Sequence, residues 1–165
     1  MYKRQYKPAA GKVGVPYAKK YLHFPHIAPN NTNDNWPVYR YADALLLLAE
    51  AQNEQGKSGQ ALINLNMVRA RAGLAASTEA GQSNLRNVIL HERRIELAFE
   101  NHRWHDLVRT GTAIPVMTAY ATMAKSTYTS LSPNAFNITP EKLLFPIPQS
   151  ERDVNPQLTQ NPGYF

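Results

Sequence analysis

The clearest hydrophobic periodicity of the chain lies near its middle. The stretch YRYADALLLLAEAQNEQ (residues 39–55) runs without Gly or Pro as far as Gly56 and predicts a first helix. After a short turn, QALINLNMVRARA (residues 60–72) predicts a second helix, which Gly73 ends in a left-handed conformation. Two helices joined by so short a turn form a helical hairpin, and this hairpin matches the tetratricopeptide repeat pattern in part.

Further helices are predicted downstream of this hairpin. Asn84 is suited to cap a third helix that runs to about Glu100, and residues 103–110 and 114–125 predict a fourth and a fifth. Pro and Asn dominate the rest of the chain, apart from KLLFPI (residues 142–147), which predicts a strand. One hairpin cannot bury both faces of its helices, so we expect stacked hairpins in an all-α fold.

These patterns divide the chain into three parts. We expect an irregular basic segment over residues 1–38, a tetratricopeptide-like helical repeat region over residues 39–126, and an irregular, loop-rich tail over residues 127–165 that packs on the helices. The 165 residues suffice for one ordinary domain, and an apolar content of 43% fits a folded globular chain rather than a disordered one.

The predicted helices place charged residues among apolar ones. The first helix is apolar almost all round, except for a narrow acidic stripe that includes Asp43, and such a helix is typically buried on several sides. Arg69 lies within the apolar arc of the second helix, and Glu92 and Glu96 lie at the centre of the apolar arc of the third. The predicted core positions are Ala61, Leu62, Leu65, Val68 and Ala72 in the second helix, and Leu85, Val88, Ile89, Ile95 and Phe99 in the third.

The pair of carboxylates on the third helix suggests two different roles. Two nearby carboxyl groups can separate their pKa values and act as acid and base, so an enzyme built on Glu92 and Glu96 is one alternative. Catalysis would need a cleft, however, and packed helix faces do not offer one. An ionised carboxylate in a core must be paired, and Arg69 is the predicted partner, with Arg93 and Arg103 as further candidates. We therefore interpret these charges as a structural network and predict no catalytic residue.

The histidines of HERRIELAFENHRWHDL do not predict a metal site. HERRI begins like the zinc-protease motif HExxH, but Ile95 stands where the second histidine should be. His102 and His105 could be neighbours on one helical turn, yet two ligands are too few and His91 lies on another face. The chain also contains no cysteine, which excludes disulfides and zinc–thiolate sites. We predict neither a metal nor a cofactor.

The net charge of +6 is concentrated at the N-terminal end. Residues 1–40 hold seven Lys/Arg and one acidic residue, whereas residues 41–165 hold eleven of each and are neutral. A basic segment is suited to nucleic acid or anionic lipid, or it can be a solubilising strand or loop. No helical or RNA-binding motif accompanies the charge, so we favour the second interpretation and expect no nucleic-acid partner.

One stretch has the composition of a carbohydrate contact. NNTNDNWPVY (residues 30–39) places Trp36 and Tyr39 beside five Asn/Asp residues. Sugar rings stack on flat aromatic faces while their hydroxyl groups need polar partners, so Trp36 and Tyr39 are candidate ligand contacts. The alternative is that Trp36 is a hydrophobic staple that packs on the first helix.

Four segments, in this order, resemble the SusD/RagB family of outer-membrane nutrient-binding lipoproteins. They are YRYADALLLLAEAQNEQG, NLNMVRARAGL, ILHERRIELAFENHRWHDLVRTG and LLFPIPQSERDVNPQLTQNPGY, and the resemblance covers about residues 36–165. It implies tetratricopeptide-like helix pairs that support an irregular region. It also implies a non-enzymatic protein that captures glycans or other nutrients at the cell surface and docks on a SusC-like TonB-dependent transporter.

The resemblance also has consequences for individual residues. It implies that Arg69 and Arg71, together with Glu92, Arg93 and Glu96, belong to the scaffold. The chain carries neither the lipoprotein signal nor the acylated cysteine of the family, so we expect it to correspond to a C-terminal third whose lipid anchor lies outside it. Oligosaccharide contacts of the family lie mostly upstream, so no ligand residue is transferred. A generic tetratricopeptide-like protein–protein interaction module remains the alternative function.

Overall fold

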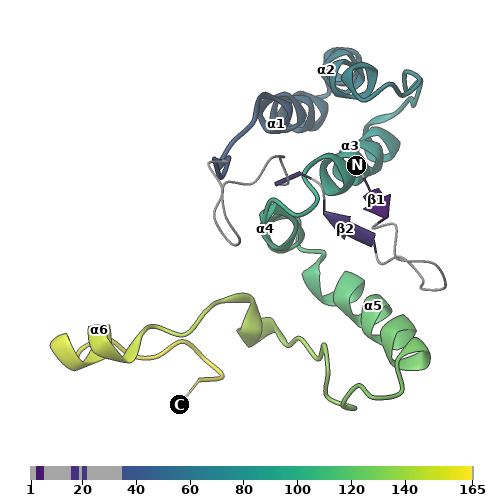
Figure 1. Cartoon of the computed structure of the whole chain (residues 1–165). Coiled ribbons are helices and arrows are strands. Elements are labelled where there is room, and N and C mark those ends of the chain that lie inside the picture. Colours follow the sequence, from purple (N-terminus) through teal and green to yellow (C-terminus); the bar gives the residue numbers. More distant parts are fainter. Residues whose placement is uncertain (1–2, 6–15, 19, 22–34, 165) are drawn as a thin grey trace. The chain divides into compact units, whose positions relative to one another are not determined.

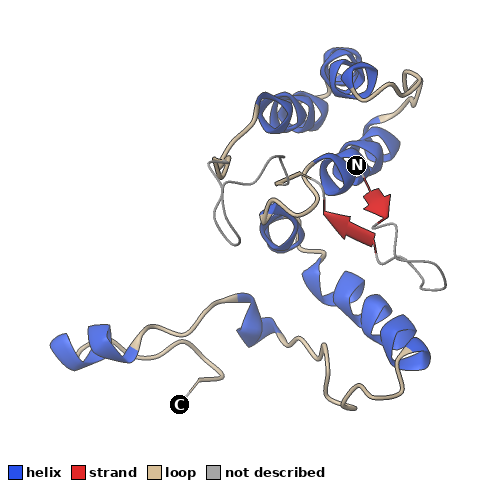
Figure 2. Ribbon diagram, viewed as in Figure 1, coloured by secondary structure: helices blue, strands red, loops and turns tan. Residues whose placement is uncertain are grey.

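The computed structural model describes residues 3–5, 16–18, 20–21 and 35–164 of the chain. Over these residues the regular structure is almost entirely helical, which confirms the predicted all-α class (Figure 2). Contacts between residues divide the chain into two compact units, Met1–Arg103 and Trp104–Phe165, here the first unit and the second unit.

The first unit is built on three helices. They are α1 (Tyr41–Glu54), α2 (Ser58–Arg71) and α3 (Gln82–Glu96) (Figure 1). α1 contacts both α2 and α3, and α1 with α2 forms the predicted hairpin. Two short strands, β1 (Lys3–Gln5) and β2 (Pro16–Ala18), pair antiparallel with Lys3 opposite Ala18. These strands fall in the segment that the sequence predicts to be irregular.

The core of the first unit comes from the apolar faces of these three helices. Its buried cluster consists of Leu45, Leu46, Ala49, Ala61, Leu65, Val68, Leu85 and Ile89. Most of these positions are those that helical periodicity predicts, because residues three and four apart share one helix face. Leu47 and Leu48, on the other side of α1, are exposed. The prediction that the first helix is buried on several sides is therefore wrong for this chain, since α2 and α3 cover only part of its apolar surface.

The helix ends agree with the sequence in part. Gly73, at φ +73°, follows the last residues of α2, which confirms its predicted left-handed conformation. α3 begins directly after Gly81, whose φ of +88° is one that few other residues tolerate. Asn84 consequently lies inside α3, and its predicted role as the cap is wrong. α1 begins after Arg40, whose extended backbone precedes the first turn.

The third helix ends earlier than predicted, at Glu96 rather than near Glu100. Phe99 and Asn101 have φ values of +70° and +63°, and an α-helix of L-residues does not accommodate this left-handed conformation. Because the helix has already ended, Phe99 leaves the packed arc and is 56% exposed. The predicted core positions Ile95 and Ala72 are exposed too, since both lie close to a helix end.

The second unit contains most of α4 and the elements that follow it. They are α4 (His102–Arg109), α5 (Ala113–Thr127), the 3-10 helix η1 (Pro140–Leu143) and α6 (Gln149–Val154). The bounds of α4 and α5 lie within two residues of those predicted. The buried apolar residues of these elements are Leu107 of α4 and the alanines Ala113, Ala121 and Ala124 of α5. None of the helices in the described part of the chain is long and apolar enough to traverse a bilayer.

The predicted strand at residues 142–147 is wrong. The segment begins in η1 and continues as irregular backbone, and side chains rather than a neighbouring strand bind its peptide groups. The Ile147 N–H donates to Gln160 Oε1 (2.8 Å), and Gln160 Nε2 donates back to the Ile147 carbonyl (3.0 Å). Asn161 and Tyr164 donate in the same way to the carbonyls of Phe145 and Leu144. An amide side chain thus replaces the partner strand.

Candidate functional site

Charged side chains gather around α3 of the first unit, beginning with the pair of Arg69 and Glu92. The Glu92 carboxylate is buried, and Arg69 Nη1 on α2 donates to its Oε2 over 2.7 Å. Arg69 Nε donates to the Ala75 carbonyl (3.0 Å), which fixes the guanidinium in place. The structure therefore brings together the two residues that the helical faces placed opposite each other. The pair links α2 to α3 and satisfies a carboxylate that burial would otherwise destabilise.

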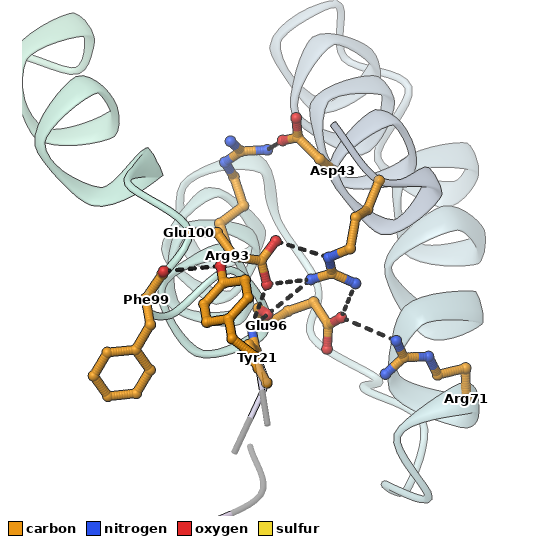
Figure 3. Close-up of polar contacts among 9 residues, drawn as sticks. Tyr21, Asp43, Arg71, Arg93, Glu96, Phe99 and Glu100 are labelled. Carbon is orange, nitrogen blue, oxygen red and sulfur yellow. Dashed lines mark hydrogen bonds and ion pairs between the residues drawn. The ribbon is translucent and has the colours of Figure 1, made fainter. Parts of the chain in front are cut away.

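A second ion pair, between Asp43 and Arg93, links α1 to α3. Arg93 Nη1 donates to Asp43 Oδ1 over 2.8 Å, and both side chains are almost completely buried, at 3% and 4% exposed. Figure 3 shows the two side chains reaching toward each other from their helices. Arg93 was predicted as a candidate partner of the carboxylates on its own helix, whereas its buried bond crosses to α1. Asp43, which the sequence placed in an acidic stripe, is thus a buried part of the network.

The densest contacts surround Arg40, directly before α1. Arg40 Nε donates to Glu100 Oε2 (2.7 Å) and Nη2 donates to Glu100 Oε1 (2.9 Å), which is a bidentate pair. Arg40 Nη1 also donates to Glu96 Oε1 (2.8 Å), and Nη2 donates to the Glu96 carbonyl (3.0 Å). One guanidinium therefore holds the buried carboxylates of Glu96, the last residue of α3, and of Glu100, and Figure 3 labels both glutamates.

Lys20 completes this group from the segment that follows β2. Its ammonium donates to the Glu96 carbonyl and to Glu100 Oε1. Lys20, Arg40, Glu96 and Glu100 are here called the Arg40 clasp. The neighbouring Tyr21 hydroxyl donates to the Phe99 carbonyl over 3.0 Å, so two consecutive residues hold the turn after α3.

The ionisation of the Arg40 clasp follows from these contacts. Burial pushes the pKa of Glu100 upward, but the hydrogen bonds from Arg40 and Lys20 outweigh burial and hold that pKa below its usual value. The hydrogen bond to Glu100 in turn raises the pKa of Arg40. Burial, followed by the charge of Glu100, raises the pKa of the Tyr21 phenol. Glu100 is therefore ionised at neutral pH and acts as an acceptor of hydrogen bonds.

The two remaining arginines of the predicted network are Arg71 and Arg103. Arg71 Nη2 lies 3.5 Å from Glu96 Oε1, and its side chain is mostly exposed. Arg103 lies in the first turn of α4 and is half-buried. The sequence did not single out Arg40, Lys20 or Glu100 as members of the network. A usable signal was the charge imbalance, because the excess cations of residues 1–40 are available to pair buried carboxylates in the neutral remainder.

This pairing changes the interpretation of the basic N-terminal segment. Two of its seven cations, Lys20 and Arg40, are bonded to carboxylates of the same chain. Lys7, Lys12 and Lys19 lie outside the described residues. Part of the charge that suggested a nucleic-acid or lipid partner therefore serves an intramolecular purpose.

Neither the carboxylates nor the histidines form a metal-binding group where the chain is described. Glu92 and Glu96 each bind a guanidinium, so they are acceptors in ion pairs. Within the described residues there is no group of three or more His, Asp or Glu side chains that could hold a metal ion. His91 and His105 are exposed, which suits solvated side chains.

The candidate sugar contact Trp36 stacks on Tyr21. The ring centroids are 4.6 Å apart and the planes are inclined by 11°. Trp36 nevertheless remains 57% exposed, and Tyr39 is 78% exposed. The alternative of a hydrophobic staple would place the indole against the first helix, whereas its stacking partner lies outside that helix.

Comparison with known proteins gives a consistent result. A family model described as the SusD family matches residues 3–164. SusD-like protein P25 of Formosa agariphila is 38% identical over 143 residues, which is 81% of this chain and 26% of that protein. SusD-like protein P2 of the same organism is 39% identical over 109 residues, covering 59% of this chain and 22% of that protein.

The solved structures include a similar fold. The crystal structure of a SusD homolog from Bacteroides thetaiotaomicron superposes with a TM-score of 0.66 and 33% sequence identity, covering 76% of this chain and 26% of that one. The chain thus spans about a quarter of the length of the relatives it matches.

Proposed function

Because the chain belongs to the SusD family, we propose that it is part of a cell-surface protein that captures an oligosaccharide and docks on a SusC-like TonB-dependent transporter. The observation that carries this proposal is the match of the family model over residues 3–164, almost the whole chain. The same premise supports the further proposal that the protein is a lipoprotein of the outer membrane. The protein binds and delivers its ligand and does not transform it.

Within this function, the charged residues around α3 form the scaffold. The pairs Arg69–Glu92 and Asp43–Arg93 connect α3 to α2 and to α1, and the Arg40 clasp connects the end of α3 to the start of α1. Ion pairs of this kind fix the relative positions of helices because a buried charge tolerates few alternative partners. The carboxylates of Glu92 and Glu96 are each bound by a guanidinium, which supports a structural role over acid–base catalysis.

The direct test is an oligosaccharide array probed with the full-length protein. We expect the protein to be retained on at least one class of glycan. A heat-denatured portion of the same sample is the control, and it should not be retained if binding is specific. In parallel, an affinity-tagged full-length protein expressed in its own cell should purify together with a TonB-dependent transporter. Binding to no member of a broad glycan panel, combined with no co-purifying transporter, would contradict the proposal.

A second function is favoured by the exposed apolar residues of the helical hairpin. Leu47 and Leu48 of α1 are exposed, as are Ile63 and Met67 of α2, and exposed apolar residues on adjacent helices suit a protein partner. A tetratricopeptide-like interaction module would bind a peptide through them. Retention of a peptide library, but of no glycan, would favour this function, and Leu48→Glu should then abolish binding.

A further inference from the structure

The segment just before α1 presents several large side chains to solvent while its one arginine points inward. Trp36, Val38 and Tyr39 are all more than half exposed, whereas Arg40 turns toward α3 and is bound in the Arg40 clasp. Exposed aromatic residues of this size are expected to find a partner, because each leaves a large apolar area in water. Arg40 therefore anchors the segment, and the residues just before it are exposed to solvent.

Within the described residues, an aromatic ring supports one face of Trp36. Tyr21 stacks on it with a centroid distance of 4.6 Å and an angle of 11° between the planes. An exposed fraction of 57% leaves much of the residue in solvent, and we assign this exposure to the indole face opposite Tyr21. Tyr21 is itself fixed through its hydroxyl to the Phe99 carbonyl (3.0 Å). The indole is thus a flat surface with a fixed support behind it.

We propose that the free face of Trp36 stacks on a pyranose ring of an oligosaccharide, with Tyr21 as the support and Arg40 as the positioning residue. The inference rests on the proposed function and adds a site within this chain. Pyranose rings present axial C–H groups on one face, which pack on an aromatic plane, while their equatorial hydroxyls need hydrogen-bonding partners. Tyr39, 78% exposed and three residues along the chain, carries such a hydroxyl.

A sugar suits this surface better than a peptide does. Peptides are usually recognised in a hydrophobic groove or along an exposed sheet edge. Here the two exposed aromatic residues carry an N–H and an O–H, so each combines a flat apolar face with a polar group. Stacking on one indole also requires no enclosed cavity.

Arg40 positions Trp36 by fixing the backbone close to it. Its guanidinium makes four hydrogen bonds to Glu96 and Glu100, and its own backbone lies four residues after Trp36. Binding loses less conformational entropy when the ring that stacks on the ligand is already held in one orientation. Loss of the guanidinium should consequently weaken binding without removing any group that touches the sugar.

The two tryptophans of the chain allow a selective experiment. Trp104→Phe leaves Trp36 as the sole indole of the 165-residue chain, and its emission is followed during titration with maltohexaose, cellohexaose, xylohexaose, laminarihexaose and mannohexaose. We expect at least one of these probes to shift the emission. Trp36→Leu, in the chain that retains Trp104, should weaken the same sugar about tenfold or more by calorimetry, because the stacking contact is lost. Trp36→Phe, which keeps a flat ring, should recover part of the affinity.

Further variants separate support from contact. Tyr21→Phe keeps the stacked ring but removes the hydrogen bond to the Phe99 carbonyl, so we expect a smaller loss of affinity and a lower fluorescence anisotropy of Trp36. Arg40→Met should also lower that anisotropy. Circular dichroism and thermal melting establish that each variant is folded before titration.

The outcomes distinguish this inference from the proposed function. Binding that Trp36→Leu leaves unchanged would overturn the stacking site while the proposed function stands. Binding of no hexaose by the 165-residue chain would likewise overturn the site, and the glycan array on the full-length protein would then decide the proposed function alone. Retention of a peptide at Trp36 in place of a sugar would overturn both the ligand class and the site as described.

Discussion

The helices of the first unit bury leucine, isoleucine and valine side chains in a shared core, whereas α5 of the second unit buries only alanines. The first unit adds ion pairs between its helices. The second unit holds its last residues by side-chain hydrogen bonds to peptide groups, such as those of Gln160 to Ile147. Burial of large apolar side chains contributes more than a few partly buried hydrogen bonds do, so the two units should differ in resistance to unfolding.

This difference indicates how the molecule distributes its roles. A unit with a leucine-rich core and buried ion pairs tolerates little rearrangement, because both packing and charge specify one arrangement. A segment held by exposed hydrogen bonds opens at lower free energy. The first unit is therefore suited to support a binding surface, and the tail of the second unit is suited to adapt to a neighbour.

The largest expected effect concerns the buried ion pair of α1 and α3. Asp43→Ala removes the carboxylate from an almost fully buried guanidinium, and such a loss costs roughly 3–5 kcal/mol. Chemical denaturation followed by circular dichroism measures it. The double variant Asp43→Leu with Arg93→Met should regain much of the lost free energy, since neither charge of this pair remains. An unchanged denaturation midpoint for Asp43→Ala would contradict the view that buried ion pairs make the first unit more resistant to unfolding than the second.

The core of the first unit gives the next effect. Leu65 is completely buried, so Leu65→Ala should lower the free energy of unfolding by about 2–5 kcal/mol through lost burial and a cavity. Leu144→Ala in the tail is the matched control, because its side chain is 60% exposed and should have little effect. Equal destabilisation by both variants would show that the tail has a core of its own.

A third effect depends on pH and on the Arg40 clasp. Because the pKa of Glu100 is lower in the folded chain than in the unfolded chain, the folded state binds fewer protons at mildly acidic pH. Its stabilising contribution is present above the pKa of a free glutamate, about 4.3, and is lost as pH falls through the lower folded value. Melting curves between about pH 5 and 3 should show this loss, and Glu100→Gln should reduce the slope.

The smallest effect lies in the tail. Gln160→Ala removes both hydrogen bonds to Ile147, and we expect faster hydrogen exchange of the Ile147 amide without a change in the global unfolding midpoint. Mass spectrometry of peptides from the tail measures the exchange. A lowered global midpoint would mean that tail and core unfold together, which would remove the distinction between the two units.

How far the sequence predicts this structure depends on how local each feature is. The helices from α1 to α5 could be predicted because hydrophobic periodicity depends only on residues close together in the sequence. The pair of Arg69 and Glu92 could be anticipated because consecutive helices face each other. The family resemblance stated from four sequence segments is confirmed by the family model.

Features that depend on distant residues could not be predicted. Lys20 and Arg40 reach carboxylates 56 to 80 residues away, and no local pattern specifies which cation meets which acid. Phe99 was placed in the core because helical periodicity continues through it, although the chain turns left-handed there. KLLFPI has the composition of a strand, but a strand also needs a partner, and the side chain of Gln160 takes that place.

The separation in sequence of the residues in the Arg40 clasp has a kinetic consequence. Arg40 and Glu96 lie 56 residues apart, so their bond closes a long loop, whereas the turns of α1, α2 and α3 form from neighbours. We expect the clasp to form after the folding transition state, once the hairpin has already placed α3. Interactions that form so late slow unfolding and leave the folding rate almost unchanged. The clasp then sets how long the folded chain persists rather than how quickly it is reached.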